Sequence, residues 1–190
     1  MDLEFRETLL SDFEDASEPL TRYKSRPDGM LVSLGAELFG VKKNGRWGWV
    51  DRLRNFVIPP VYDDGRPVCV DGIIILKKNG CYGGLYYDTM TQAFDFKYNQ
   101  LAYIPPTGTY AAFAHSSKQA LVRPGDKRIT RYRYSGFRFD GVGNVEFVRE
   151  SMLGTVRGAI DPVTGCELWS RSDMLETIMR PFERLLYDYE

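Results

Sequence analysis

The chain has 190 residues, with 25 Lys and Arg side chains against 26 Asp and Glu, and a formal net charge of -1. This length fits one domain or two small ones, and a composition that is 43% hydrophobic and 27% charged excludes wholesale disorder. No stretch approaches the ~20 apolar residues that span a bilayer, and the N-terminus lacks the pattern of a signal peptide. Three cysteines without metal-ligand spacing favour a reducing compartment, so we expect a cytoplasmic protein.

Residues 1–35 form an acidic segment that we interpret as an N-terminal cap or arm. Its first 20 residues hold seven carboxylates against the single base Arg6. Apolar side chains between residues 3 and 13 lie near one helical face and predict a short helix, whereas residues 17–26 are interpreted as a linker or extended arm. An acidic arm that tolerates disorder until it is bound suits a basic partner, through electrostatic steering. The candidate protein-binding residues here are Asp12, Glu14, Asp15 and Glu18.

Residues 36–170 are predicted to be a β-repeat domain. Asn-Gly and Asp-Gly pairs interrupt short β-type runs, which is typical of antiparallel hairpins. Lys-Lys-Asn-Gly occurs at residues 42–45 and again at 77–80, and a tyrosine recurs every 36 residues at Tyr62, Tyr98 and Tyr134. Independent positions that share one period indicate internal repeats. We predict about four antiparallel three-stranded units, over residues 36–70, 71–107, 108–143 and 144–170.

The first unit shows how such a repeat would fold. Residues 38–43 are predicted to pair with residues 46–51 across Asn44-Gly45, because both central residues of this hairpin turn need positive φ. A third strand over residues 56–58 is expected to end at Pro59-Pro60, which lack N–H donors.

The stretch Gly-Arg-Trp-Gly-Trp-Val-Asp-x4-Phe-Val-Ile-Pro-Pro-x-Tyr-Asp over residues 45–63 resembles the WG repeat, a β-rich bacterial repeat named for its Trp-Gly pair. Weaker matches follow at residues 74–98, 118–134 and 156–165. The resemblance implies an interaction module without a shared active site. Trp47 and Tyr82 are expected in the core, and a glycine inside a strand is expected where a ring or second backbone passes closely. The positions interpreted as structural are Trp47, Gly48, Tyr62, Tyr82, Gly83 and Tyr98.

Residues 123–138 form a basic, aromatic-rich strip. Such a strip could follow a phosphate backbone. It also fits an alternating strand whose arginines face water while its tyrosines pack inward. The isoelectric point near 6.0 favours the second interpretation, because typical nucleic-acid-binding domains are basic. The strip and the second unit add protein-binding candidates, namely Tyr86, Arg131, Tyr132, Arg133 and Tyr134.

Residues 171–190 are predicted to be a C-terminal helical cap. Apolar residues at helical spacing over residues 173–189 predict an amphipathic helix, and Pro181 would kink it. Repeat arrays need such caps over their terminal apolar faces.

The sequence contains little that indicates catalysis. His115 is the only histidine, and its neighbours Ser116 and Ser117 would point to different faces of a strand. No phosphate-binding loop and no set of metal ligands occurs, so no cofactor is predicted. We expect a non-enzymatic, cytoplasmic protein-binding module, in its specific form an immunity or inhibitor protein against a basic toxin domain. The alternatives are a nucleic-acid-associated or regulatory factor that uses residues 123–138 and, third, an enzyme whose carboxylates the sequence cannot place. The oligomeric state, and whether the array is linear or closed, stay open.

Overall fold

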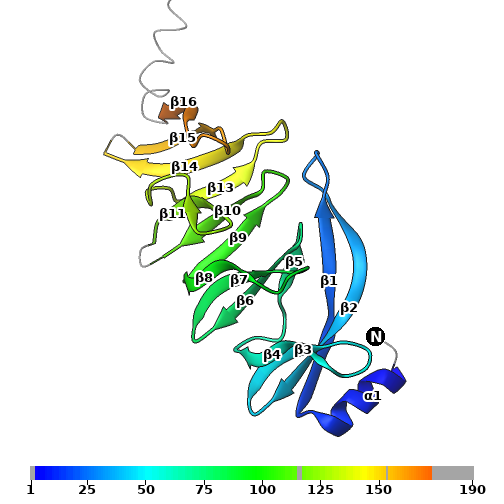
Figure 1. The fold of residues 1–190 in the computed structure, drawn as a ribbon. Coiled ribbons are helices and arrows are strands. Elements are labelled where there is room, and N and C mark those ends of the chain that lie inside the picture. Colours follow the sequence, from blue (N-terminus) through cyan, green and yellow to red (C-terminus); the bar gives the residue numbers. More distant parts are fainter. Residues whose placement is uncertain (1–2, 115–116, 153, 173–190) are drawn as a thin grey trace, which may run out of the picture.

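The computed structural model describes residues 3–114, 117–152 and 154–172, in which the chain forms one helix and sixteen strands. The molecule is an elongated, open array with α1 (Leu3–Asp12) at one end and β16 (Glu167–Ser172) at the other (Figure 1). The predictions of a mostly β protein and of a short N-terminal helix are confirmed. The helix predicted over residues 173–189 lies outside the described residues. Within the described ranges no helix has the length and apolar character needed to cross a membrane.

Consecutive strands form four antiparallel meanders of four strands each, which we call units 1 to 4. Units 1 and 2 share one eight-stranded sheet, whereas units 3 and 4 each form a four-stranded sheet. Unit 1 comprises β1 (Asp15–Ser25), β2 (Leu31–Lys43), β3 (Arg46–Val50) and β4 (Phe56–Tyr62), and unit 2 comprises β5 (Val68–Val70), β6 (Ile73–Lys78), β7 (Cys81–Tyr86) and β8 (Gln92–Tyr98). Unit 3 comprises β9 (Gln100–Ile104), β10 (Thr109–Phe113), β11 (Gln119–Arg123) and β12 (Lys127–Arg128), and unit 4 comprises β13 (Gly136–Phe139), β14 (Val145–Ser151), β15 (Gly154–Ile160) and β16.

The three-stranded unit predicted from the sequence lacks one strand. In every unit an opening strand, β1, β5, β9 or β13, pairs antiparallel with the second strand of the same unit. β5 has only three residues, which is too short for an alternating pattern to be recognised. The predicted end at Pro59-Pro60 is also wrong, because β4 continues through both prolines to Tyr62. The prolines are tolerated because β4 is the edge of its sheet and its ladder with β3 shifts register there.

The segment interpreted as a linker or extended arm, residues 17–26, belongs to strand β1 as far as Ser25, so that interpretation is wrong. β1 and β2 form a long hairpin, and the boundary predicted at residue 35 falls inside β2. Ala16 and Leu20 of β1 are buried. Leu9 of α1 is fully buried with apolar residues of β2 and β3, so the N-terminal segment is part of the core of unit 1.

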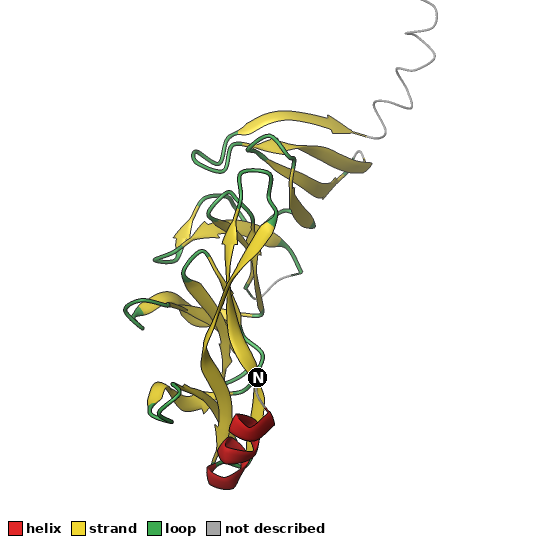
Figure 2. Cartoon of the chain, turned by 90° about the vertical axis from the view of Figure 1, so that its right-hand side faces the viewer, coloured by secondary structure: helices red, strands yellow, loops and turns green. Residues whose placement is uncertain are grey.

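The β1–β2 hairpin extends along the array, as Figures 1 and 2 show. Near its end, Asp71 accepts hydrogen bonds from the hydroxyls of Ser25 and Tyr103, which belong to units 1 and 3. Its tip reaches unit 4: a Cβ on Gly29 would lie 2.9 Å from Cδ1 of Phe139. The hairpin therefore contacts every other unit.

One backbone hydrogen bond is repeated at each junction between consecutive units. The residue after each of the three periodic tyrosines donates its N–H to a carbonyl in the second strand of the next unit. The bonds are Asp63 N to Lys77 O at 2.8 Å, Asn99 N to Phe113 O at 2.8 Å, and Ser135 N to Val148 O at 2.6 Å. The donors are 36 residues apart, so the period of the tyrosines is also the period of the backbone.

The residues interpreted as structural lie in or against the core. Tyr62, Tyr98 and Tyr134 are all buried, whereas Trp47 and Tyr82 are half-buried and pack against core clusters. The largest fully buried side chain is Trp49, in the core shared by units 1 and 2.

The expectation for the strand glycines is confirmed. A Cβ on Gly48 would lie 2.7 Å from the backbone N of Pro60, and one on Gly83 would lie 2.8 Å from the ring of Phe96. Each glycine therefore lets the fourth strand of its unit cross closely.

Candidate functional site

A groove opens where β1 and β5 diverge. The two strands pair in parallel only at Arg22 with Cys69 and at Tyr23 with Val70. Before Arg22, β1 is paired with β2 on one edge, while its other edge faces the β4–β5 loop across a cavity of about 700 Å³. We call this cavity the β1 groove, and its lining residues are Arg6, Asp15 to Thr21, Tyr23, Trp47 and Asp64 to Val68.

The indole of Trp47 forms part of the groove wall. A Cβ on Gly65 would lie 2.5 Å from Cδ2 of this ring, so the absence of a side chain at Gly65 lets the β4–β5 loop lie flat against the indole. Trp47 packs on the other side against the core cluster that contains Trp49 and Tyr62. The ring is therefore held in place while part of its surface faces the groove. A half-buried aromatic ring of this kind is common at the centre of protein interfaces.

Three carboxylates and two guanidinium groups line the groove. Asp15 accepts a hydrogen bond from the N–H of Ala16 at 2.8 Å, and Asp64 accepts one from the N–H of Arg66 at 3.0 Å. The carboxylate of Glu18 is exposed and makes no hydrogen bond or ion pair to a described residue. The carboxylates of Asp15 and Asp64 are thus held by backbone N–H groups, whereas the carboxylate of Glu18 is available to a partner. Sequence reasoning identified Asp15 and Glu18 but missed Asp64, Arg6 and Arg66, which only the fold brings together.

The other two acidic candidates are engaged within unit 1. Asp12 forms an ion pair with Arg54, and Glu14 accepts a hydrogen bond from the N–H of Gly45 at 3.0 Å. Neither lines the groove. The prediction that the acidic segment tolerates disorder until it is bound is wrong, because α1 and β1 are packed and paired.

The basic strip is not the alternating strand that its sequence predicts. Residues 131–134 are irregular apart from one bridge between Gln119 and Tyr134. Tyr134 is buried and donates a hydrogen bond to Glu167 at 2.8 Å, so it is not available to a partner.

Three of the six bases in the strip are engaged within the protein. Arg133 pairs with Glu167, Arg138 pairs with Glu146, and Arg123 donates to the carbonyl of Pro162 at 2.9 Å. Lys127, Arg128 and Arg131 are exposed, with Arg128 lying 5.9 Å from the ring centroid of the half-buried Tyr132. The last aromatic candidate, Tyr86, is 38% exposed at the end of β7. The basic surface is therefore smaller than the sequence implies.

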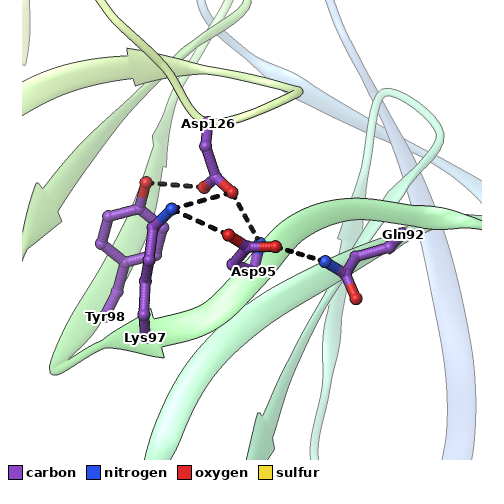
Figure 3. Close-up of polar contacts among 5 residues, drawn as sticks. All are labelled: Gln92, Asp95, Lys97, Tyr98 and Asp126. Atoms are coloured by element: carbon purple, nitrogen blue, oxygen red, sulfur yellow. Dashed lines mark hydrogen bonds and ion pairs between the residues drawn. The ribbon is translucent and has the colours of Figure 1, made fainter.

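A polar cluster joins units 2 and 3 (Figure 3). Asp126 accepts hydrogen bonds from the hydroxyl of Tyr98 at 2.7 Å and from the N–H of Asp95 at 3.1 Å, and it pairs with Lys97 at 3.0 Å. Burial alone would raise the pKa of the Asp126 carboxyl, but hydrogen bonds from Tyr98 and Lys97 hold it below its usual value. Burial, together with Asp126, raises the pKa of Tyr98. The hydrogen-bond donors and acceptors of these residues are paired with one another, so the cluster connects units 2 and 3.

A second cluster lies beside the hairpin. The guanidinium of Arg22 is 4.6 Å from the ring centroid of Tyr87 and pairs with Glu37 at 3.3 Å. Burial and a hydrogen bond to Glu37 raise the pKa of Tyr87 to about 12. Beneath it, burial raises the pKa of the Cys69 thiol to about 11, which makes this thiol a poor nucleophile near pH 7.

The described residues offer no metal centre, because no group of three or more His, Cys, Asp or Glu side chains among them converges. His115 and Ser116 lie outside the described residues.

Comparison with known proteins supports the repeat. The family model of the WG containing repeat matches residues 47–82, so the resemblance to this family is confirmed over that segment, which supports a β-rich repeat module. The match covers one repeat, and the number of WG repeats stays a prediction. A search of the curated proteins found no match to this chain.

Solved structures give weak similarity. KlHsv2 with loop 6CD replaced by a Gly-Ser linker matches with 9% identity and a TM-score of 0.43, over 81% of this chain and 66% of that one. Hsv2 of Kluyvelomyces marxianus matches with 11% identity and a TM-score of 0.35, over 82% of this chain and 62% of that one. The chain thus spans less than two thirds of either protein.

Proposed function

We propose that this chain is a non-enzymatic protein-binding module that holds a basic, extended segment of a partner protein in the β1 groove. The observation that carries the proposal is the groove itself, where three carboxylates and a fixed indole line the unpaired edge of a strand. The WG repeat at residues 47–82 supports it, because Trp47 of the Trp-Gly pair forms part of the groove wall.

The strand edge supplies the backbone contacts. Between Asp15 and Thr21, β1 pairs with β2 on one side, apart from a register shift at Ser17 and Glu18, and faces the cavity on the other. An extended peptide can add to such an edge through main-chain hydrogen bonds, while pockets for alternate side chains supply specificity. The part of the Trp47 indole that faces the groove would make an apolar contact with a side chain of that peptide.

The charges of the groove favour a protein segment over a nucleic acid. A phosphate backbone would face Asp15, Glu18 and Asp64, whereas a lysine or arginine of a partner would be attracted by them. Arg6 and Arg66 can donate to carbonyl or carboxylate groups of the same segment. This mixed pattern fixes the direction and register of a peptide more than it raises its affinity.

In its specific form, the proposed module is a bacterial cytoplasmic immunity or inhibitor protein, whose partner is a basic toxin domain. The carboxylates of the groove support this form, because a basic surface is what they would recognise, and inhibition by occlusion needs no catalytic group. A partner of this kind would associate at a rate that falls as ionic strength rises.

The test is to measure binding of an array of extended, lysine- and arginine-containing peptides to the full chain. We expect Glu18→Arg to weaken the best peptide about tenfold, mainly through its association rate. The matched control is Glu7→Arg, which makes the same charge change on an exposed residue of α1 outside the groove. Equal effects of the two variants would overturn the groove as the site.

The nucleic-acid alternative is tested in the same experiment, with DNA and RNA oligonucleotides as probes at low and moderate salt. Binding that falls steeply with salt and is abolished by Arg131→Glu would favour the exposed bases of the strip instead.

A further inference from the structure

The second and third strands of every unit present apolar side chains at the same three positions. Two of these positions form a cross-strand pair, and the third lies opposite the small residue of the third strand. We call the three positions the docking face of a unit, and all of their side chains are buried. They are Phe39, Val50 and Val41 in unit 1, Ile74, Leu85 and Leu76 in unit 2, Tyr110, Val122 and Ala112 in unit 3, and Val145, Ile160 and Phe147 in unit 4.

In units 2 to 4, the end of the preceding unit covers the docking face. Tyr62, Tyr98 and Tyr134 each share a core cluster with the docking face that follows them in the chain. The residue after each tyrosine donates the junction hydrogen bond, and the accepting carbonyl belongs to the residue after the docking-face residue opposite the small residue. A docking face thus receives an aromatic ring and the backbone N–H that follows it.

In unit 1, α1 covers the docking face instead. Leu9 is fully buried in one cluster with all three positions of this face, and the half-buried Phe5 and Phe13 pack against the same cluster. The rings of Phe5 and Phe39 lie 4.7 Å apart, edge to face. Figures 1 and 2 show the helix at this end of the array.

Glu14 reproduces the polar contacts of a junction. Its N–H donates to the carbonyl of Lys42 at 3.0 Å, and Lys42 holds the position of the junction acceptor in every other unit. Its carboxylate accepts a hydrogen bond from the N–H of Gly45 at 3.0 Å, just as Asp63 accepts one from the N–H of Gly80 at 2.6 Å. An aromatic residue, Phe13, precedes Glu14 as Tyr precedes Asp63. The N-terminal segment therefore imitates the end of a unit.

We propose that the docking face of unit 1 is an interaction surface for the end of a WG-type unit of another protein, and that α1 covers this surface as an internal competitor. The partner segment is an extended strand that ends in an aromatic residue followed by an acid, as β4 leads into Tyr62-Asp63. Its ring takes the place of the apolar side chains of α1. Its acid accepts the hydrogen bond that Gly45 now donates to Glu14.

α1 is a small cover for this face. The helix has ten residues, and Leu10, next to the buried Leu9, is 46% exposed. A helix of this length is marginal in water by itself, so its place depends on its contact with the docking face. A partner that binds the same face has to displace α1, and its apparent affinity is lowered by the fraction of molecules in which the face is covered.

The partner is another protein rather than a second copy of this chain. The periodic tyrosines Tyr62 and Tyr98 pair with the residue before the strand glycine of their unit, and in unit 4 that place is held by Arg171, which pairs with Arg157. Arg171 is exposed and carries a charge, which an apolar face does not accommodate. The other unit ends of the chain already cover the docking faces of units 2 to 4.

This surface is separate from the proposed peptide site. Phe39, Val41 and Val50 do not line the β1 groove, which attracts basic segments, whereas the docking face takes a strand with an acidic end. Glu18→Arg should therefore leave the binding described below unchanged, so the two proposals fail independently.

The first test uses a labelled peptide that copies residues 56–64, titrated with the full chain and followed by fluorescence anisotropy. We expect Leu9→Asp, which unseats α1, to bind this peptide about tenfold more tightly than the parent chain. Leu10→Asp is the matched control, because it places the same carboxylate on an exposed position of the same helix, and it should bind like the parent. Equal binding by all three chains, or no binding to Leu9→Asp, would overturn the proposal.

The chemistry of the partner is tested with a second peptide, in which serine replaces the residues that correspond to Tyr62 and Asp63. We expect this peptide to bind Leu9→Asp about tenfold more weakly than the first. Equal affinities would show that the face does not recognise the aromatic and acidic pair. If Leu9→Asp does not unfold cooperatively, Phe5→Ala is the milder variant, since it removes only the ring against Phe39, and it should change binding in the same direction.

Competition is tested in the parent chain itself. At saturating concentrations of the first peptide, the backbone amides of α1 should exchange hydrogen faster, because the helix has left its place on unit 1. The amides of β14 and β15 in unit 4 serve as the internal control and should not change. Peptide binding without faster exchange in α1 would overturn the role of α1 as a competitor.

Discussion

The junction between units 1 and 2 and the junction between units 2 and 3 use one geometry with different chemistry. Residues with positive φ recur at Arg54, Met90 and Asp126, which are 36 residues apart and occupy equivalent turns. At the second junction, Asp126 accepts a hydrogen bond from the buried Tyr98. At the first, the equivalent turn presents Met90, which packs against the cluster containing Tyr62, and the Tyr62 hydroxyl makes no hydrogen bond to a described residue.

The difference shows that the backbone of this repeat is more regular than its side chains. A buried ring and a crossing backbone are required at each junction, whereas the group that covers the ring is free to be apolar or acidic. A family model built on side chains therefore matches residues 47–82, although the donors of the junction hydrogen bond keep their spacing to residue 135. At the third junction Glu167 takes the role of the acid and binds Tyr134.

The largest expected effect tests whether the two halves of the array unfold together. Trp49→Ala in the core of units 1 and 2 and Phe147→Ala in unit 4 each empty a fully buried site, and each should lower the free energy of unfolding by about 3–5 kcal/mol. Because the hairpin contacts all the units, we expect one cooperative transition in urea, followed by fluorescence and circular dichroism. Two separate transitions in either variant would show that the halves are independent.

The next effect compares the glycines that let strands cross. Gly48→Ala should cost about 1–3 kcal/mol, since the new methyl group meets the backbone of Ile58 and Pro60. Gly83→Ala should cost less, because its nearest obstacle is the ring of Phe96 at 2.8 Å and the nearest backbone atom, in Asp95, is at 3.0 Å, whereas at Gly48 the backbone itself is at 2.7 Å. Unit 3 already has Ala120 at the equivalent position, and Ala120→Gly should cost about 0.5–1 kcal/mol. Equal costs at Gly48 and Gly83 in chemical denaturation would contradict the crossing geometry.

The comparison of the junctions is tested directly by removing tyrosine hydroxyls. Tyr98→Phe should lower the free energy of unfolding by about 1 kcal/mol, because Asp126 loses one of its donors. Tyr62→Phe should be close to neutral. The reverse order, measured under the same denaturing conditions, would mean that the first junction depends on a hydrogen bond after all.

The smallest effect is a dependence on pH. The pKa of Asp126 is lowered in the folded state, so its stabilising contribution is complete above the unfolded value of about 3.9. The contribution is lost as the pH falls through the lower folded value. Asp126→Asn should therefore flatten the acid limb of stability against pH below about pH 4, while Glu7→Gln on exposed α1 should not. An unchanged acid limb in Asp126→Asn would show that the carboxylate does not stabilise the junction.

The sequence predicted the parts of the fold that depend on local spacing. Asn44-Gly45 and Asn79-Gly80 form the expected turns, with positive φ at all four residues. The tyrosine period revealed the repeat because a buried ring is needed at the same point of each unit. β1 was missed because charged residues and Pro19 mask its pattern, and its second partner, β5, is far away in the sequence.

The groove was predicted only in part for the same reason. Asp15 and Glu18 belong to an acidic cluster that is visible in the sequence. Asp64 and Arg66 are far from them in the sequence, and the four residues line one cavity because β1 and β5 pair at only two positions and then diverge. A single base such as Arg6 among seven carboxylates does not indicate a binding site in the sequence. Long-range strand divergence, rather than composition, therefore creates this site.

The reach of the hairpin has a consequence for synthesis on the ribosome. Gly29 packs against Phe139, which lies 110 residues later in the chain (139 minus 29). At about 5–20 residues per second, the tip of the hairpin exists for roughly 5–20 s before its last contact has been made. During that interval the first units can form, but the contact between the tip of the hairpin and unit 4 cannot. Completion of the fold therefore waits for unit 4, and a chain that stalls before residue 139 has a hairpin that contacts units 2 and 3 but whose tip lacks its contact with Phe139.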